Sequence, residues 1–376
     1  MRNNPTDLRL PLLAAVSFLI PVSALAHPDH PHPWLLAKAV AAPAPEAPVA
    51  VTRPVERAGQ GDFVFRYAPE LSSLPEAALP NLPQAHGGFA VDPETGEVFF
   101  GLKGAGIIWM SNDLTEKRVL PASDPRLLEG NFHNTTLLRR ADGKRFLALP
   151  DNEKGRVFVT TDTGELVGTL DAPRQANAYY AGGGAFNPTD TEYAGGNLYV
   201  ADGYSPGNYI TVANPWTARW LDLVFGGKTG PAREYGLFGT AHGITWNANT
   251  RRLVIADRAN SRVQEFDLQG TFLSNTALPA GSLPCDVDFL GGYTLVGCLD
   301  GPTAQRPAPA PFYVLDQDGH LVSEVVPKRD FGLELFTHIH NATWKTTVAA
   351  DGKSVKTYVL ATAWNPGGFA VFELVK

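Results

Sequence analysis

The chain has 376 residues, of which 18% are charged and 44% are hydrophobic, so it carries enough apolar side chains for a large core and is not disordered as a whole. Its formal net charge is −7, which provides no general positive field and argues against nucleic acid or an anionic membrane surface as a partner. The 37 glycines and 31 prolines favour many short strands joined by turns over a helical protein.

The N-terminal residues have the pattern of an export signal. Arg2 and Arg9 precede an apolar run from Leu10 to Leu25, and the small residues Ala24 and Ala26 fit a signal-peptidase site. A membrane anchor is the alternative, but about 16 residues interrupted by prolines are short for a span. We therefore predict a signal peptide over residues 1–26, a mature form without a membrane span, and a periplasmic or secreted location.

Residues 27–60 are rich in histidine, proline and alanine and show no periodicity, which predicts a flexible linker. His27, His30 and His32 lie at its start, and His27 would become the new N-terminus after cleavage. Together with the terminal amine they could chelate copper or zinc. Loose chelation without a defined site is the simpler interpretation.

From Asp62 onward, short β-branched and aromatic runs alternate with glycine- and asparagine-containing turns, which predicts strands. Six units with this texture begin 42 to 56 residues apart, the length of a four-stranded propeller blade. Their starts are His86, His133, Asn187, His242, Pro284 and His340. We predict an all-β, six-bladed β-propeller over residues 61–376. The strand Asp62–Tyr67 is expected to complete the last blade and close the ring.

The sequence contains two cysteines, Cys285 and Cys298. They flank Gly291 and Gly292, which look like a hairpin turn between two short strands. Because an exported protein can form disulfides, we predict a cross-strand disulfide between them.

Histidines stand at the start of four of the six units. The first strand of a propeller blade lines the central channel, so residues at these starts are expected to gather at one end of it. His133, His242 and His340 fall on alternate blades, an arrangement suited to a three-histidine metal site with an open position. Polar channel residues that hold water are the alternative. His86 is a fourth histidine, which could close the site and make it structural.

These residues resemble the peptidyl-α-hydroxyglycine α-amidating lyases among the NHL-repeat propellers. The stretch around His242 and the run Ala256–Phe266 are similar to that family's histidine blade, and Asn187–Asp190 with Asp202–Tyr204 resembles the preceding blade. The resemblance extends over about residues 80–376 and is strongest over 187–266.

The resemblance implies a zinc ion, or another divalent transition metal, on His133, His242 and His340, and a catalytic base at Tyr204. It implies a C–N lyase that converts an α-hydroxyglycine-type carbinolamide to an amide and an aldehyde, acting on a small peptide-like or acyl-glycine-like substrate. We expect the protein to be a monomer.

This chain departs from the family pattern at three positions. Lys103 stands where the family has an arginine, and a lysine lacks that residue's bidentate fork. His338 stands where the family has a methionine, and could add a ligand or an acid–base group. Asn341 stands where an aspartate helps to hold a structural calcium, so calcium is possible.

Two other functions remain open. The chain could be a non-catalytic NHL propeller that binds a protein or peptide at the channel mouth. It could also be a lactonase-type hydrolase with calcium held by residues such as Asp190, Asp286 and Asn341, although histidine dominates the predicted channel.

Overall fold

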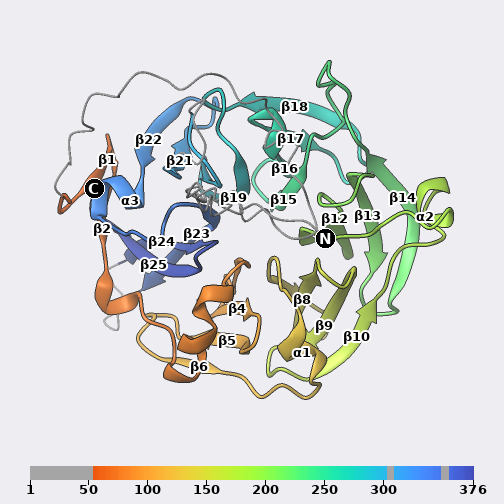
Figure 1. The fold of residues 1–376 in the computed structure, drawn as a ribbon, viewed down its shortest axis with the longest axis horizontal. Coiled ribbons are helices and arrows are strands. Elements are labelled where there is room, and N and C mark those ends of the chain that lie inside the picture. Colours follow the sequence, from red (N-terminus) through yellow and green to blue (C-terminus); the bar gives the residue numbers. More distant parts are fainter. Residues whose placement is uncertain (1–53, 303–308, 349–354) are drawn as a thin grey trace, which may run out of the picture. The chain divides into compact units, whose positions relative to one another are not determined.

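The computed structural model describes residues 54–302, 309–348 and 355–376. Within them, strands form six antiparallel sheets arranged around a centre as the blades of a β-propeller (Figure 1). The predicted fold class is therefore confirmed. The predicted signal peptide and most of the predicted linker, including its three histidines, lie outside the described residues. No helix in the described part of the chain is long and apolar enough to cross a membrane.

Each blade has its innermost strand first in sequence, except that the last blade also takes strands from the N-terminal end. The first blade contains β3 (Phe89–Val91), β4 (Val98–Leu102), β5 (Gly106–Met110) and β6 (Lys117–Val119). The second contains β7 (Thr136–Arg139), β8 (Arg145–Asp151), β9 (Arg156–Thr161) and β10 (Leu166–Leu170). The third contains β11 (Asp190–Ala194), β12 (Asn197–Ala201), β13 (Tyr209–Asn214) and β14 (Arg219–Gly226).

The fourth blade contains β15 (Ala241–Asn247), β16 (Arg252–Asp257), β17 (Arg262–Phe266) and β18 (Phe272–Ala277). The fifth contains β19 (Pro284–Leu290), β20 (Tyr293–Cys298), β21 (Phe312–Leu315) and β22 (Leu321–Val325). The last contains β23 (Ile339–Val348), β24 (Val355–Ala363), β25 (Gly368–Leu374), β2 (Phe63–Tyr67) and β1 (Ala58–Gln60). Short helices lie between strands: η2 (Pro69–Leu71), η3 (Glu76–Gln84), α1 (Arg126–Glu129), α2 (Ala178–Ala181), η4 (Arg258–Asn260) and α3 (Pro327–Phe331).

The apolar core lies between neighbouring blades, because each sheet has an adjacent sheet on both faces. Phe99 and Ile107 of the first blade form one buried cluster with Leu147 and Phe158 of the second. Strands buried on both faces read as nearly continuous apolar runs, and all five residues of β4 are buried. Buried runs of this kind explain why short apolar segments bounded by turns predicted the strands correctly.

The ring is closed by the N-terminal strand, as the sequence predicted. β2 pairs with β25, with Phe65 opposite Leu374 and Tyr67 opposite Phe372. Ala58–Gln60, at the end of the predicted linker, forms β1 and pairs with β2. The last blade is thus made from both ends of the described chain.

The predicted disulfide is wrong, because Cys285 and Cys298 are both free and buried. The two strands do pair, but Cys298 lies opposite Pro284, and the register shifts between Pro284 and Asp286. This irregularity separates the environments of the two thiols. Cys298 packs with Val296 and Tyr313 in a core cluster, whereas the Cys285 sulfur lies 3.8 Å from Nη1 of Arg258.

Candidate metal centre

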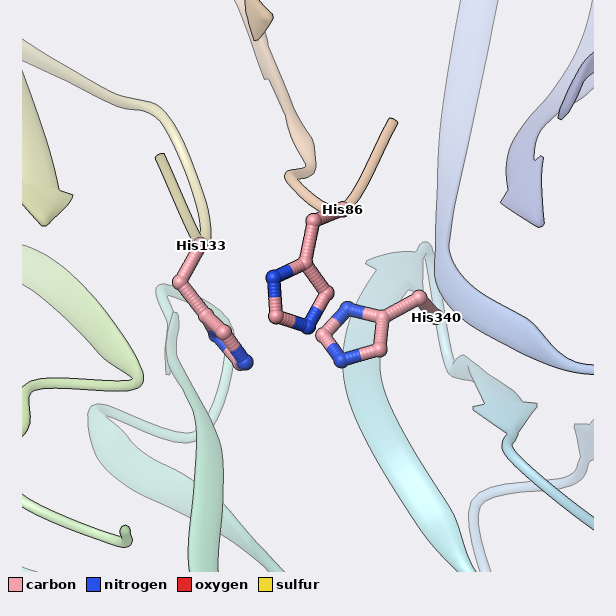
Figure 2. Close-up of side chains that lie close together, drawn as sticks. All are labelled: His86, His133 and His340. Atoms are coloured by element: carbon pink, nitrogen blue, oxygen red, sulfur yellow. The ribbon is translucent and has the colours of Figure 1, made fainter. Parts of the chain in front are cut away.

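Four histidine side chains from four blades converge at one place in the channel. His86 precedes β3, His133 precedes β7, His242 lies in β15 and His340 lies in β23. The ring centroid of His133 is 4.4 Å from that of His86, 4.7 Å from that of His242 and 4.5 Å from that of His340. Figure 2 shows the rings of His86, His133 and His340 pointing toward one another. The three predicted ligands and the extra His86 therefore form one buried cluster.

Three of the histidines are oriented by an oxygen acceptor at Nδ1. Nδ1 of His133 lies at hydrogen-bond distance from the Thr189 carbonyl, and Nδ1 of His242 is 2.7 Å from the Cys285 carbonyl. Nδ1 of His86 is 3.3 Å from the side-chain oxygen of Asn131. A neutral imidazole that donates from Nδ1 keeps a lone pair on Nε2, and metal-binding histidines are commonly oriented in this way.

His133 and His340 present buried nitrogens that suit a metal ion. Nε2 of His133 and both ring nitrogens of His340 have no hydrogen-bond partner among the described residues. Each side chain belongs to a residue that is 2% exposed. Leaving buried polar atoms unsatisfied is costly, and nitrogens gathered in this way could hold a metal ion. Imidazole nitrogen is a good ligand for zinc and other transition metals, so the cluster fits the predicted cofactor class.

The nitrogen and sulfur donors fall into two groups that share His340. One contains His86, His133 and His340, and the other contains His242, Cys285 and His340; within each group the ligand atoms lie within 4.8 Å of one another. A cavity of about 10 Å³ is lined by His133, His242, His340 and Cys285, among others. This volume holds a single ion or water, not a substrate.

The electrostatic environment keeps the histidines in the form that binds metal. Burial lowers the pKa of His133 and of His340 well below the usual value, and the neighbouring imidazoles and Arg258 lower it further. Both rings are therefore neutral at neutral pH. A neutral imidazole is required for coordination, so no proton has to be displaced from these two ligands.

Tyr204 lies beside the cluster and contacts Arg258, an arginine that the sequence analysis did not single out. Its Oη is 3.1 Å from Nε2 of His242 and accepts a hydrogen bond of 3.1 Å from Nη1 of Arg258. The guanidinium carbon lies 5.1 Å from the centre of the phenol ring. Burial raises the pKa of Tyr204, while Arg258 acts in the opposite direction.

Arg258 was missed because the residues around it look structural. Asn260 and Arg262 donate hydrogen bonds to Asp257 and so tie the fourth blade together. Arg258 begins η4 directly after β16 and is 2% exposed. Its place at the end of the strand that pairs with β15, which carries His242, is a signal that could have marked it.

The two other predicted catalytic residues have partners elsewhere. Nζ of Lys103 forms an ion pair of 2.6 Å with Glu153. Nδ1 of His338 lies 3.0 Å from the Leu299 carbonyl and 3.2 Å from a carboxylate oxygen of Asp300. The ring centroid of Trp364 lies 5.9 Å from that of His338, 5.7 Å from that of His86 and 6.4 Å from that of His340. Roles for Lys103 and His338 stay predictions.

Acidic and amide side chains form the next layer of the channel. Asn134 donates to Asp190, and Asn341 donates to Asp286. Asp286 and Asn134 also line a cavity of about 580 Å³ that includes Glu192 and Asp288. Burial raises the pKa of Asp190 and Asp288 to about 7 and that of Glu192 to about 8. These oxygens suit a hard cation, but calcium stays a prediction.

The raised pKa of Glu192 predicts a pH-dependent stability. A carboxyl group with a higher pKa in the folded state than in the unfolded state costs stability as pH rises from the unfolded value, 4.5, to the folded value, about 8. Glu192→Gln keeps an acceptor for the backbone N–H of Tyr193 and cannot ionise. We expect the metal-free variant to gain about 3–4 kcal/mol relative to the wild type between pH 5 and pH 8. Urea unfolding across this range measures the difference.

The exposed Glu116 provides a control for this experiment. Glu116→Gln should unfold like the wild type at each pH, to within about 0.5 kcal/mol. A free-energy difference for Glu192→Gln that stays constant from pH 5 to pH 8 would contradict the raised pKa.

Comparison with solved structures shows the same fold at low sequence identity. A luciferin-regenerating enzyme is 10% identical with a TM-score of 0.53, over 84% of this chain and 95% of that one. A gluconolactonase from Xanthomonas campestris is 12% identical with a TM-score of 0.53, over 88% of this chain and 99% of that one. These likenesses establish the propeller fold and nothing finer. No known family profile and no curated protein sequence matches the chain.

Proposed function

We propose that this propeller is a metal-dependent lyase that cleaves the C–N bond of an α-hydroxyglycine-type carbinolamide to give an amide and an aldehyde. The observation that carries the proposal is the convergence of His86, His133, His242 and His340, with Tyr204 Oη placed 3.1 Å from Nε2 of His242. A buried group of imidazoles with a polar side chain at its edge provides both a cation site and a proton acceptor.

The residues around the cluster support this chemistry. A zinc ion held by histidines supplies Lewis acidity, which makes a nearby hydroxyl group easier to deprotonate. Tyr204 Oη takes the hydroxyl proton of the substrate, and the Arg258 guanidinium favours the phenolate that accepts it. As the carbon–oxygen double bond of the aldehyde forms, the C–N bond breaks and its electron pair goes to the amide nitrogen. That nitrogen then takes up a proton, which balances the reaction.

In this proposal, the ammonium group of Lys103 binds the carboxylate of the substrate. Its ammonium group is paired with Glu153, so a substrate carboxylate would have to replace that partner. A lysine offers a point charge in place of the paired donors of an arginine. Weak discrimination among acyl-glycine-like substrates follows from this difference.

Tyr204→Phe tests the catalytic role, because it removes the proton acceptor and keeps the ring beside His133 and His242. We expect aldehyde release from an N-acyl-α-hydroxyglycine to fall by about 10²- to 10⁴-fold, with the metal content unchanged. The assay is kcat for aldehyde formation by zinc-loaded protein, alongside metal analysis of the same samples. Tyr235→Phe is the control, since Tyr235 is 61% exposed and should retain full activity.

The same measurements separate the lyase from a binding protein. Metal-loaded wild-type protein that releases no aldehyde, or a Tyr204→Phe variant as active as the wild type, would contradict the proposal. The first result would favour a non-catalytic propeller that binds a protein or peptide at the channel mouth.

A further inference from the structure

Cys285 lies in the wall of the channel beside the histidine cluster. It is 1% exposed and sits in β19, the innermost strand of its blade, where the pairing register with β20 shifts. Its sulfur and a ring nitrogen each of His242 and His340 all lie within 4.8 Å of one another. The backbone carbonyl of Cys285 also lies 2.7 Å from Nδ1 of His242. The same residue therefore orients one histidine and presents a sulfur atom next to it.

His340 connects this sulfur to the other histidines. Its ring belongs both to the group with His86 and His133 and to the group with His242 and Cys285. Both ring nitrogens are buried without a hydrogen-bond partner among the described residues. No described hydrogen bond therefore commits His340 to the all-histidine group, and the ring can bind an ion beside Cys285.

Arg258 places a buried cation next to Cys285, and it opposes the burial that raises the pKa of this thiol to about 11. Arg258 is 2% exposed, and its guanidinium hydrogen-bonds to Tyr204 Oη at 3.1 Å and to Cys285 Sγ at 3.8 Å. The groups that act on it most strongly are the Tyr204 phenol and the Cys285 thiol. A buried cation normally has an anionic neighbour. A thiolate at Cys285 would supply one, and metal coordination is the common way to hold a buried thiolate.

We propose that Cys285 is a metal ligand and that His242, Cys285 and His340 form a mixed nitrogen–sulfur site for a thiophilic divalent cation such as Zn²⁺. The inference rests on the proposed function only in placing a metal in the same channel. On binding, the thiol proton is released to solvent as the sulfur–metal bond forms, and no electrons are transferred. A thiolate ligand selects zinc or cobalt over magnesium and calcium.

Cobalt binding tests the proposal, because a thiolate bound to Co²⁺ gives a charge-transfer band in the near ultraviolet that imidazole ligands do not give. We would titrate the metal-free full chain with Co²⁺ and compare the wild type with Cys285→Ser and Cys298→Ser. Cys298 is the matched control, since it is also a free buried thiol but packs with Val296 and Tyr313. We expect the band in the wild type and in Cys298→Ser, and its loss in Cys285→Ser. A band that persists in Cys285→Ser would overturn the proposal.

X-ray absorption of the zinc-loaded wild type gives a second test that needs no variant. We expect a sulfur scatterer at about 2.3 Å together with nitrogen at about 2.0–2.1 Å. A shell of nitrogen and oxygen alone overturns the role of Cys285 and leaves the proposed lyase intact. Zinc that does not bind overturns both proposals. A sulfur shell in a protein that releases no aldehyde supports the site and contradicts the lyase.

Discussion

His340→Ala is expected to remove the transition metal from the purified protein. Both donor groups in the channel contain His340, so its loss leaves two donors in each. Removing even a residue that only orients a metal ligand typically weakens affinity by 10- to 100-fold, and we expect a loss of at least about 100-fold when the ligand itself is removed. Metal analysis of protein prepared without a histidine tag, followed by titration with zinc, measures this change.

His320→Ala is the control for His340→Ala. The His320 side chain is 78% exposed, and it belongs to a separate surface group with Asp316 and Asp318. Its replacement should leave stoichiometric metal in the channel. Full metal retention in His340→Ala, or equal loss in both variants, would show that the ion is not held by the histidine cluster.

Phe65→Ala is expected to destabilise the whole propeller by about 3–5 kcal/mol. Phe65 lies in the closing strand β2, is 0% exposed, and packs its ring 5.3 Å from Phe312 and 6.1 Å from Trp344. These contacts join the N-terminal strand to the fifth and last blades. The closed ring buries faces that no single blade can cover, so we expect the blades to unfold together. The urea midpoints recorded by circular dichroism and by tryptophan fluorescence should therefore fall by the same amount.

Val167→Ala provides the matched control, since Val167 lies in β10, another outer strand, and is 51% exposed. We expect its free energy of unfolding to stay within about 0.5 kcal/mol of the wild type. Phe65→Ala could instead unfold in two separate steps, with the other blades still folded after the first. That result would show that the N-terminal strand stabilises only its own blade and not the whole propeller.

The blade pattern and the closing strand followed from the sequence because they depend on local signals. Short apolar runs between turns mark strands that are buried on both faces, and unit starts such as His86 and His242 mark the innermost strands. The last unit lacked one strand, and Asp62–Tyr67 was the isolated strand left to supply it. The disulfide prediction was wrong because it depended on strand register, which local signals do not fix. Hairpin spacing brought Cys285 and Cys298 onto paired strands, but a register shift of one residue directs side chains to different places.

The six-bladed ring and the histidines that enter its channel could be predicted from the amino-acid pattern, because both follow from periodicity along the chain. The side chains that surround those histidines could not be predicted in this way. Arg258 against Tyr204 and Cys285 against His340 come from different blades, and no local pattern encodes which of two buried side chains faces the channel. Ring closure and the register shift in β19 set the directions of these side chains. The donors of the proposed metal centre can therefore be identified only from the packed blades.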